Sequence, residues 1–279
     1  MAALLACPEC GDPLRQRDRA LRCDHGHSFD IARQGYVGLL TGASTKMTGD
    51  TPAMLDARAA FQGAGHFAPI AEAVAHAFRA GASGSAATPD GPMLEIGAGT
   101  GYYLATVLTT YPGLRGIALD VAKPAARRAA RAHPGLASIL ADAWRGLPIR
   151  DGVLTGVLSV FAPRNPAEVA RVLAPGGRFV VATPTARHLG ELIEPLGMVQ
   201  VDPDKDRRLA AALGDTFTRT EHTLVEFPMK LSRADVTNVV AMGPSAFHGT
   251  PADDPRIAAL TDSTEVTASV AVSTYVPNP

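Results

Sequence analysis

The chain has 279 residues, 46% of them hydrophobic and 19% charged, a composition that suits one large folded domain plus a small module. Its net charge of −1 excludes an overall positive field that would hold it on nucleic acid or on an anionic membrane, so any RNA binding has to be local. No apolar run is long enough to span a bilayer, and the apolar start at residues 1–6 is too short for a signal sequence. We therefore predict a cytoplasmic protein with no membrane partner.

All three cysteines lie near the N-terminus, as Cys7-Pro-Glu-Cys10 and Cys23, and two histidines, His25 and His27, follow them. A C-x2-C pair and a C-x3-H pair supply four ligands that suit tetrahedral Zn²⁺, so we predict a closed, structural zinc site. A short segment with few large apolar side chains needs such a site in order to fold. His27 is favoured as the fourth ligand, because a single residue between Cys23 and His25 leaves a tight spacing. Reduced thiols without a metal are the alternative.

Two helices are expected next. Asp50 or Thr51 can cap a helix that begins at Pro52, and a second helix over residues 68–80 has apolar residues at four-residue spacing. A loop rich in glycine, serine and alanine at 81–91 then leads into the next strand.

Residues 93–103 are a short apolar run that breaks into glycines at every second position, Gly97, Gly99 and Gly101, with Glu95 in front of them. This pattern predicts a buried strand that turns into a helix and leaves its backbone open to a ligand, because glycine has no Cβ and adopts positive φ. The acidic-x-G-x-G-x-G form is typical of S-adenosylmethionine sites, whereas the G-x-G-x-x-G form of dinucleotide sites fails at Tyr102. A glycine-rich turn without a ligand is the alternative.

Strands and helices alternate after this turn. A strand at 114–119 ends in Asp120, which stands 21 residues (120 − 99) after Gly99, where a nucleotide-binding unit places the acceptor for ribose hydroxyls. Strands at 137–141, 152–161 and 178–183 follow. The alternation predicts a parallel, doubly wound sheet with ligands at the carboxyl ends of its strands. The residues expected at that edge are Glu95, Asp120, Asp142 and the loop 161–165.

The C-terminal part differs in character. Residues 220–227 and 265–276 alternate like antiparallel strands, with a helix over 233–242 between them.

Taken together, the motifs resemble those of class I S-adenosylmethionine-dependent methyltransferases, and more narrowly those of the RlmA-type 23S rRNA guanine-N1 methyltransferases. The resemblance runs nearly end to end, and one further set of segments is similar to the actinomycete branch associated with resistance to tylosin-like macrolides. The resemblance to the family is carried by Cys7-Pro-x-Cys10, Cys23-x3-His27-Ser-Phe-Asp30, Gly35-Tyr36-Val37, Gly65-His66-Phe67, Glu95-Ile-Gly-Ala-Gly-Thr-Gly101-Tyr102, Phe161-Ala-Pro163, Pro175-Gly-Gly177, Thr183-Pro184 and His188-Leu189.

The resemblance implies a class I, Rossmann-like α/β fold with a mostly parallel sheet and an antiparallel C-terminal hairpin. It divides the chain into a zinc-binding module at 1–40, a helical linker region at 41–92 and a methyltransferase domain at 93–279. It also implies that Cys7, Cys10, Cys23 and His27 bind zinc, that the zinc module helps to grip a 23S rRNA hairpin, and that a homodimer is a candidate assembly.

The cofactor site implied by the resemblance includes Phe67, Thr100, Gly101 and His188 beside the acidic and glycine residues already named. Phe67 departs from the family, where tyrosine is usual, so a hydroxyl contact to the cofactor is lost while the ring can still pack.

The function implied is methylation of guanine N1 in a 23S rRNA hairpin, with macrolide resistance as a possible role. Phe161 and Tyr102 are candidates for an aromatic cradle around the guanine, and Arg164 and Asn165 either read the base edge or stabilise their loop. No general base is assigned. The alternatives are a methyltransferase that acts on a small molecule or a protein, a non-catalytic RNA-binding protein, and a nicotinamide-dependent oxidoreductase that the glycine spacing disfavours.

Overall fold

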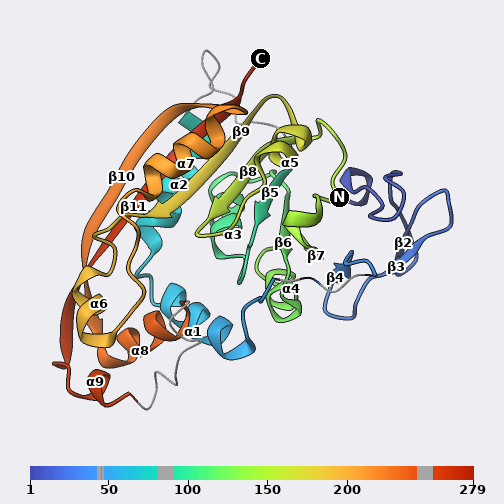
Figure 1. Cartoon of the computed structure of the whole chain (residues 1–279). Helices are drawn as coiled ribbons and strands as arrows, with labels where there is room; N and C mark the ends of the chain where they lie inside the picture. The colour runs from blue at the N-terminus through green and yellow to red at the C-terminus, as the bar shows by residue number, and fades with distance from the viewer. Residues whose placement is uncertain (43–44, 46, 81–90, 244–253) are drawn as a thin grey trace.

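A computed structural model describes residues 1–42, 45, 47–80, 91–243 and 254–279 (Figure 1). The loop predicted at 81–91 lies, apart from Gly91, outside the described residues. Within these ranges, no helix is long and apolar enough to cross a membrane.

The N-terminal segment forms a small antiparallel sheet and then joins the main sheet. The elements of the small sheet and the turn before it are η1 (Ala2–Leu4), β1 (Arg15–Arg17), β2 (Ala20–Arg22) and β3 (Ser28–Asp30). Strand β4 (Tyr36–Gly38) follows the small sheet along the chain and is part of the main sheet. It pairs in parallel with β7 (Leu136–Leu140), at one edge of that sheet. The sequence did not predict β4, because three residues are too few for a periodic signal.

Within the described residues the main sheet has eight strands, in the order β10-β11-β9-β8-β5-β6-β7-β4. Its other strands are β5 (Met93–Ile96), β6 (Gly116–Asp120), β8 (Leu154–Val160), β9 (Leu173–Pro184), β10 (Phe217–Ser232) and β11 (Ser263–Pro277). Every pair from β9 to β4 is parallel, whereas β11 pairs antiparallel with both β9 and β10. The predicted parallel sheet and its antiparallel C-terminal hairpin are confirmed.

Helices cover both faces of this sheet (Figure 1). They are α1 (Pro52–Gly63), α2 (Ala68–Ala80), α3 (Tyr102–Thr110), α4 (Lys123–Ala129), α5 (Pro166–Val172), α6 (Gly190–Leu196), α7 (Lys205–Gly214), α8 (Arg233–Ala241) and α9 (Pro255–Ala258), with a short turn η2 (Ala143–Arg145). Successive strand residues point to opposite faces, so Met93 packs in a core with α2 and α3, while Leu94 packs in a second core with α5 and α7.

The N-terminal module is part of the second core. Leu5, Leu14 and Leu21 pack in the same cluster of buried residues as Ile117 of β6. Leu5 also forms an isolated antiparallel bridge with Ile149, in the loop before β8. The module is therefore joined to the main domain by buried apolar side chains as well as by the chain itself.

The predicted helices before β5 are present. Helix α1 begins at Pro52, and Thr51 is its cap, because the Thr51 hydroxyl accepts a hydrogen bond from the Met54 N–H at 3.2 Å. Helices α6 and α7 were missed, and α6 is poorly marked in the sequence because it contains Pro195.

Candidate functional site

The predicted zinc ligands converge. The ligand atoms of Cys7, Cys10, Cys23 and His27 all lie within 4.8 Å of one another. The Cys10 and Cys23 Sγ atoms are 3.7 Å apart, and His27 Nδ1 lies 3.5 Å from Cys7 Sγ and 3.3 Å from Cys23 Sγ. Tetrahedral Zn²⁺ with bonds of about 2.3 Å to sulfur and 2.0 Å to nitrogen separates its ligand atoms by roughly 3.5 to 3.8 Å. The donor set and its spacing therefore fit zinc.

The competing ligand, His25, lies to one side of this group. Its Nδ1 is 2.7 Å from the Asp12 carboxylate, and its side chain is 67% exposed. His25 and Asp12 form a second close group of ligand atoms, which shares only Cys10 with the first. The geometry therefore favours His27 as the fourth ligand.

The glycine turn after β5 has the backbone conformation predicted for it. The φ angles of Gly97, Gly99 and Gly101 are 67°, 54° and 79°. A Cβ on Gly97 would lie 2.6 Å from the Ala162 Cβ, and a Cβ on Gly99 would lie 2.8 Å from Arg58 Nη1. A side chain at either position would meet protein atoms, so the turn packs closely against the loop after β8 and against α1, and of its three glycines Gly97 lines a cavity.

Two carboxylates lie in or beside the turn. Asp120, at the end of β6, accepts hydrogen bonds from the N–H groups of Gly99 and Ala122, both at 2.8 Å. Burial raises the pKa of Asp120. Each of its oxygens keeps a second lone pair, so the predicted contact with ribose hydroxyls is open to it.

Glu95 is 1% exposed and accepts a hydrogen bond from the Leu104 N–H at 3.1 Å. Leu104 lies in the first turn of α3, whose cap residue Gly101 has no side chain to satisfy the helix N–H groups. Burial raises the pKa of Glu95 to about 8. Glu95 therefore fixes the helix that continues the glycine turn.

A cavity of about 760 Å³ opens beside the turn. Four aromatic side chains line it, namely Phe67, Tyr103, Phe161 and His188. The rings of Phe161 and His188 stack with centroids 5.8 Å apart, and the ring of Phe67 lies 5.8 Å from His188 and 6.3 Å from Phe161. Phe161 is 40% exposed and has φ 53°, a strained conformation that is most often kept at functional sites.

The strand order places Asp120 and two of the aromatic residues on opposite sides of the glycine turn, and Asp120 lies outside the described wall of the cavity itself. Asp120 follows β6 on one side of β5, whereas Phe161 follows β8 and His188 follows β9 on the other side. The glycine turn lies between them. A ligand held by the turn and Asp120 would therefore lie next to an aromatic surface on which a flat second ligand can stack.

His188 is held as a neutral imidazole. Its Nδ1 accepts a hydrogen bond from the Ser269 N–H at 3.2 Å, so the ring proton is on Nε2. Burial, together with the charge of Lys205, lowers the pKa of His188 to about 4. In this state His188 can donate a hydrogen bond from Nε2 and is unsuited to remove a proton through that atom.

Other predicted residues lie elsewhere. Tyr102 is absent from the cavity wall, and its neighbour Tyr103 lines the cavity instead. Thr100 donates a hydrogen bond to Gln62 at 2.7 Å, and Asn165 caps α5 by accepting the Glu168 N–H at 3.4 Å. Asn165 therefore has the loop-stabilising contact that the sequence left open, and a base-reading role for it stays a prediction.

The sequence analysis missed residues of α1 that line the cavity. Gln62 and Arg58 lie four residues apart on one face of α1, and Arg58 pairs with Asp50 and donates a hydrogen bond to the Met242 carbonyl at 2.8 Å. The four-residue spacing was the available signal, but nothing in the sequence indicates that this face packs on the glycine turn.

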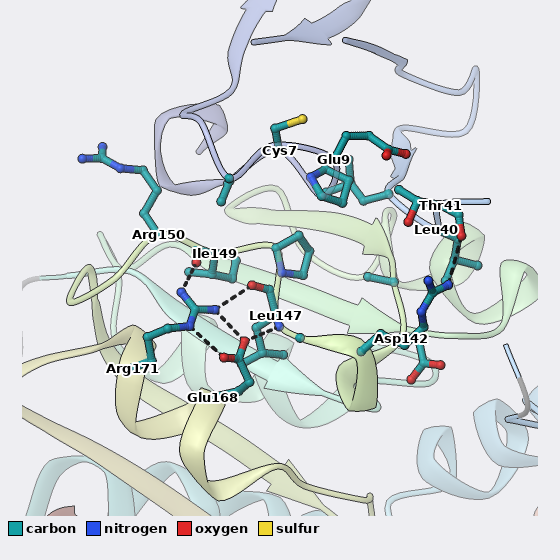
Figure 2. Close-up of a pocket in the computed structure, with 18 of the residues that line it drawn as sticks. Cys7, Glu9, Leu40, Thr41, Asp142, Leu147, Ile149, Arg150, Glu168 and Arg171 are labelled. Atoms are coloured by element: carbon teal, nitrogen blue, oxygen red, sulfur yellow. Dashed lines mark hydrogen bonds and ion pairs between the residues drawn. The ribbon is translucent and has the colours of Figure 1, made fainter. Parts of the chain in front are cut away.

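A second groove, of about 710 Å³, lies between the N-terminal module and the loop after β7 (Figure 2). Asp142 lines this groove and not the cavity, and it accepts hydrogen bonds from the Thr45 hydroxyl at 2.6 Å and the Trp144 N–H at 3.0 Å. Its contact with the cofactor therefore stays a prediction. On the same loop, Trp144 is 52% exposed and Arg145 donates a hydrogen bond to the Thr41 carbonyl at 3.0 Å.

One salt bridge fixes the floor of this groove (Figure 2). Arg171 donates hydrogen bonds to the carbonyl oxygens of Leu147 and Ile149 at 2.9 and 2.8 Å, and it pairs with Glu168, which in turn accepts the Leu147 N–H at 2.6 Å. Arg171 and Glu168 thus hold the loop on which Leu5 of the N-terminal module pairs with Ile149.

Comparison with known proteins agrees with this geometry. Residues 5–44 match a zinc-ribbon family described as RlmA, N-terminal, and residues 94–181 match a methyltransferase domain family. A chain from the solved complex between the Haloferax volcanii Trm112 methyltransferase activator and a methyltransferase superposes with a TM-score of 0.50 at 17% identity, over 84% of this chain and all of that one. The fold and the glycine turn define a class I S-adenosylmethionine-dependent methyltransferase.

Two relatives with similar sequences indicate which group of these methyltransferases the chain belongs to. The chain is 46% identical to the 23S rRNA (guanine(748)-N(1))-methyltransferase of Streptomyces fradiae, over 99% of this chain and 97% of the relative. It is 47% identical to a Micromonospora griseorubida protein described as a 23S rRNA (guanine-N(1)-)-methyltransferase, over 98% and 97% of the two chains. The chain belongs to the family of 23S rRNA guanine-N1 methyltransferases with an RlmA-type zinc ribbon, as the resemblance of its motifs predicted.

Proposed function

We propose that this protein transfers a methyl group from S-adenosylmethionine to N1 of a guanine in a 23S rRNA hairpin. The observation that carries the proposal is the cavity that Gly97 and Ala98 of the glycine turn share with the aromatic group of Phe67, Phe161 and His188. Asp120 accepts a hydrogen bond from the Gly99 N–H of the same turn. The relatives, which are described as acting on guanine N1 of 23S rRNA, supply the substrate.

The cofactor brings an electrophilic methyl group, so the protein chiefly has to position the guanine and exclude water. Phe161 offers an exposed ring for a base that has left its stack. Guanine N1 carries a proton, and no residue of the described cavity is assigned to remove it, since His188 Nε2 is itself a donor. Loss of the N1 proton to solvent after transfer is consistent with this arrangement.

The residues proposed to hold the cofactor are the predicted Glu95, Gly97, Gly99, Gly101 and Asp120, of which Glu95 and Gly97 line the cavity. Phe67 and His188 also line this cavity, together with Phe161.

The zinc module is proposed to grip the RNA. Arg17, Arg19, Arg22 and Arg33 are exposed on its surface, where they are open to phosphate groups. A homodimer, in which a second copy adds its own module, is part of this proposal, and size-exclusion chromatography with light scattering tests it. Ribosomal RNA as the substrate agrees with the cytoplasmic location predicted from the sequence.

The decisive experiment is transfer of radiolabelled methyl from S-adenosylmethionine to an unmodified 23S rRNA transcript, followed by primer extension. Methylation at N1 blocks base pairing, so one new stop at a guanine is expected. The Asp120→Ala variant is the control and should show no stop, because it binds the cofactor poorly. Incorporation without a stop would place the methyl group at another position, and no incorporation despite cofactor binding would count against rRNA as substrate.

We also propose macrolide resistance as the cellular role, which the resemblance of the motifs to the actinomycete branch implies. Expression of the protein in a tylosin-sensitive bacterium should raise the inhibitory concentration of tylosin, while the Asp120→Ala variant should not.

A further inference from the structure

His188 lies on a loop that is hydrogen-bonded to strand β11 on both sides of the histidine. Before His188, the Thr185 N–H donates to the Ser269 carbonyl at 3.0 Å, and after it the Leu189 N–H donates to the Thr267 carbonyl at 2.8 Å. Leu189 has φ 57°, a left-handed conformation that is strained for a residue other than glycine. The loop therefore keeps a strained backbone directly beside the ring that lines the cavity.

A line of side-chain hydrogen bonds joins the same loop to strand β10. The hydroxyl oxygens of Thr185 and Ser269 are 2.6 Å apart, and the Ser269 hydroxyl donates to a Glu226 carboxylate oxygen at 2.8 Å. Glu226 stands directly opposite Ser269 in the pairing of β10 with β11, and its other oxygen pairs with Arg187 of the loop at 2.9 Å. Ser269 is fully buried, so water does not compete for these bonds.

The carboxylate fixes the direction of each bond in this line. Ser269 has one hydroxyl proton and donates it to Glu226, so its oxygen has to accept the proton of the Thr185 hydroxyl. The Thr185 oxygen in turn accepts the Arg187 N–H at 3.2 Å. Hydrogen bonds to an ionised group are stronger than those between neutral groups. Glu226 therefore holds the loop in one arrangement.

The residue in the middle of the line also orients the imidazole. The Ser269 N–H donates to His188 Nδ1 at 3.2 Å, which places the ring proton on Nε2. The ring stacks on Phe161 and lies 5.8 Å from Phe67. The backbone and the side chain of Ser269 thus set both the tautomer of the ring and the place of the loop that carries it.

We propose that Glu226 is a positioning residue for methyl transfer, which acts through Ser269 and Thr185 on the ring of His188. This assignment rests on the proposed function, in which His188 lines the cofactor site. Glu226 itself lies outside the described wall of the cavity. The competing role is to stabilise the hairpin of β10 and β11, but the two strands already pair along nearly their whole length without this side-chain contact.

The test compares Thr185→Val and Glu226→Gln with Thr185→Ser. Valine has the shape of threonine without its hydroxyl, glutamine lacks the charge at the end of the line, and serine keeps the hydroxyl. Thr223→Val is the matched control, because Thr223 is an exposed threonine of β10 outside this line. Calorimetry measures binding of S-adenosylhomocysteine and the melting temperature, and ¹⁵N NMR reports the tautomer of His188, whose signals are assigned with a His188→Asn variant.

Thr185→Val and Glu226→Gln should each weaken S-adenosylhomocysteine binding by roughly threefold or more, the effect of about one lost hydrogen bond. In both variants the His188 ring should change from the single Nε2–H tautomer to a mixture of the two. Thr185→Ser and Thr223→Val should match the wild type within about twofold and keep the single tautomer.

A lower melting temperature with unchanged affinity and an unchanged ring would overturn the proposal, because the line would then only stabilise the hairpin. A weaker affinity with an unchanged ring would also overturn it, since the effect would not pass through His188.

Methyl transfer by the wild-type chain to an unmodified 23S rRNA transcript separates this proposal from the proposed function. The NMR measurement needs neither cofactor nor RNA, so absence of transfer by the wild type would count against the proposed function alone. Transfer by the wild type, combined with wild-type affinity and tautomer in Thr185→Val and Glu226→Gln, would count against the positioning role alone.

Discussion

His27 and His25 are close in sequence but differ in their surroundings. His27 Nδ1 lies near the sulfur atoms of Cys7 and Cys23, whereas His25 is exposed and next to Asp12. We expect His27→Asn to lose bound zinc and His25→Asn to retain about one equivalent, as measured by atomic absorption on purified protein. Equal zinc loss in the two variants would mean that the ligand set has been assigned wrongly.

Glu95 is a second residue whose environment has a measurable effect. Its pKa is raised from 4.5 to about 8, mainly by burial, so the folded state keeps a proton that the unfolded state releases. Below pH 4.5 the carboxyl is protonated in both states and has no effect on stability. As the pH rises from 4.5 to 8, the free energy of unfolding therefore falls.

Glu95→Gln should remove this pH dependence, because the amide oxygen can still accept the Leu104 N–H and cannot ionise. At pH 8 we expect the melting temperature of the variant to exceed that of the wild type by at least about 2 °C, and at pH 4.5 the difference should vanish. Calorimetry at the two pH values measures both. A variant that is less stable than wild type at pH 8 would show that Glu95 is ionised in the fold.

The sequence was sufficient to predict those site residues that are recognised by their spacing along the chain. The zinc ligands, the three glycines and Asp120 belong to this group, because each acts through neighbours at fixed distances along the chain. It missed Arg58, Gln62 and the shift from Tyr102 to Tyr103, because these depend on how α1 and α3 pack against the turn.

At the scale of elements, the glycine turn is defined both by its φ angles and by the space around it. Gly97 and Gly152 have similar φ angles, 67° and 62°, but a Cβ would meet Ala162 at 2.6 Å in the first and nothing within 4 Å in the second. An alanine at either position would therefore suffer a similar backbone strain, whereas only an alanine at position 97 would also clash with a neighbour.

Gly152→Ala should cost only about 1 kcal/mol for a left-handed alanine, a fall of about 2–4 °C in melting temperature. Gly97→Ala should lower the melting temperature further and weaken S-adenosylhomocysteine binding at least tenfold, since the turn has to shift away from Ala162. Calorimetry measures both quantities. Similar losses in the two variants would show that the space around Gly97 is not needed.

The order of strands and helices after β5 followed from alternating patterns in the sequence, and the antiparallel hairpin followed from its period of two. The pairing of β4 with β7 did not, because it joins residues that are 102 positions apart (138 − 36) and rests on three residue pairs. Helix α7 was missed although it is amphipathic, since its many charged residues obscured the apolar face formed by Leu209 and Leu213.

For the whole molecule, the zinc module and the methyltransferase domain are coupled. If only the chain joined the two parts, removal of zinc would be expected to unfold the module and leave cofactor binding largely intact. The shared core of Leu5, Leu14 and Leu21 with Ile117, together with β4 on the main sheet, changes that expectation. We now expect chelation to weaken the second core as a unit.

Treatment with a zinc chelator should lower the melting temperature of the whole chain by more than about 5 °C in a single transition, and should weaken S-adenosylhomocysteine binding. Calorimetry with and without the chelator measures the transition. The His27→Asn variant, which is expected to lack zinc, is the control, because the chelator should leave its transition unchanged. Two separate transitions, with the upper one and the cofactor affinity unchanged, would restore the picture of independent modules.

Trp144 is the one tryptophan of the chain. It lies half exposed on the loop between Asp142 and Ile149, the residue that pairs with Leu5 of the zinc module. Its fluorescence therefore comes from a single known position. A shift in its emission maximum on adding RNA, cofactor or chelator would report a change in the surroundings of this loop in the native protein, without any attached dye.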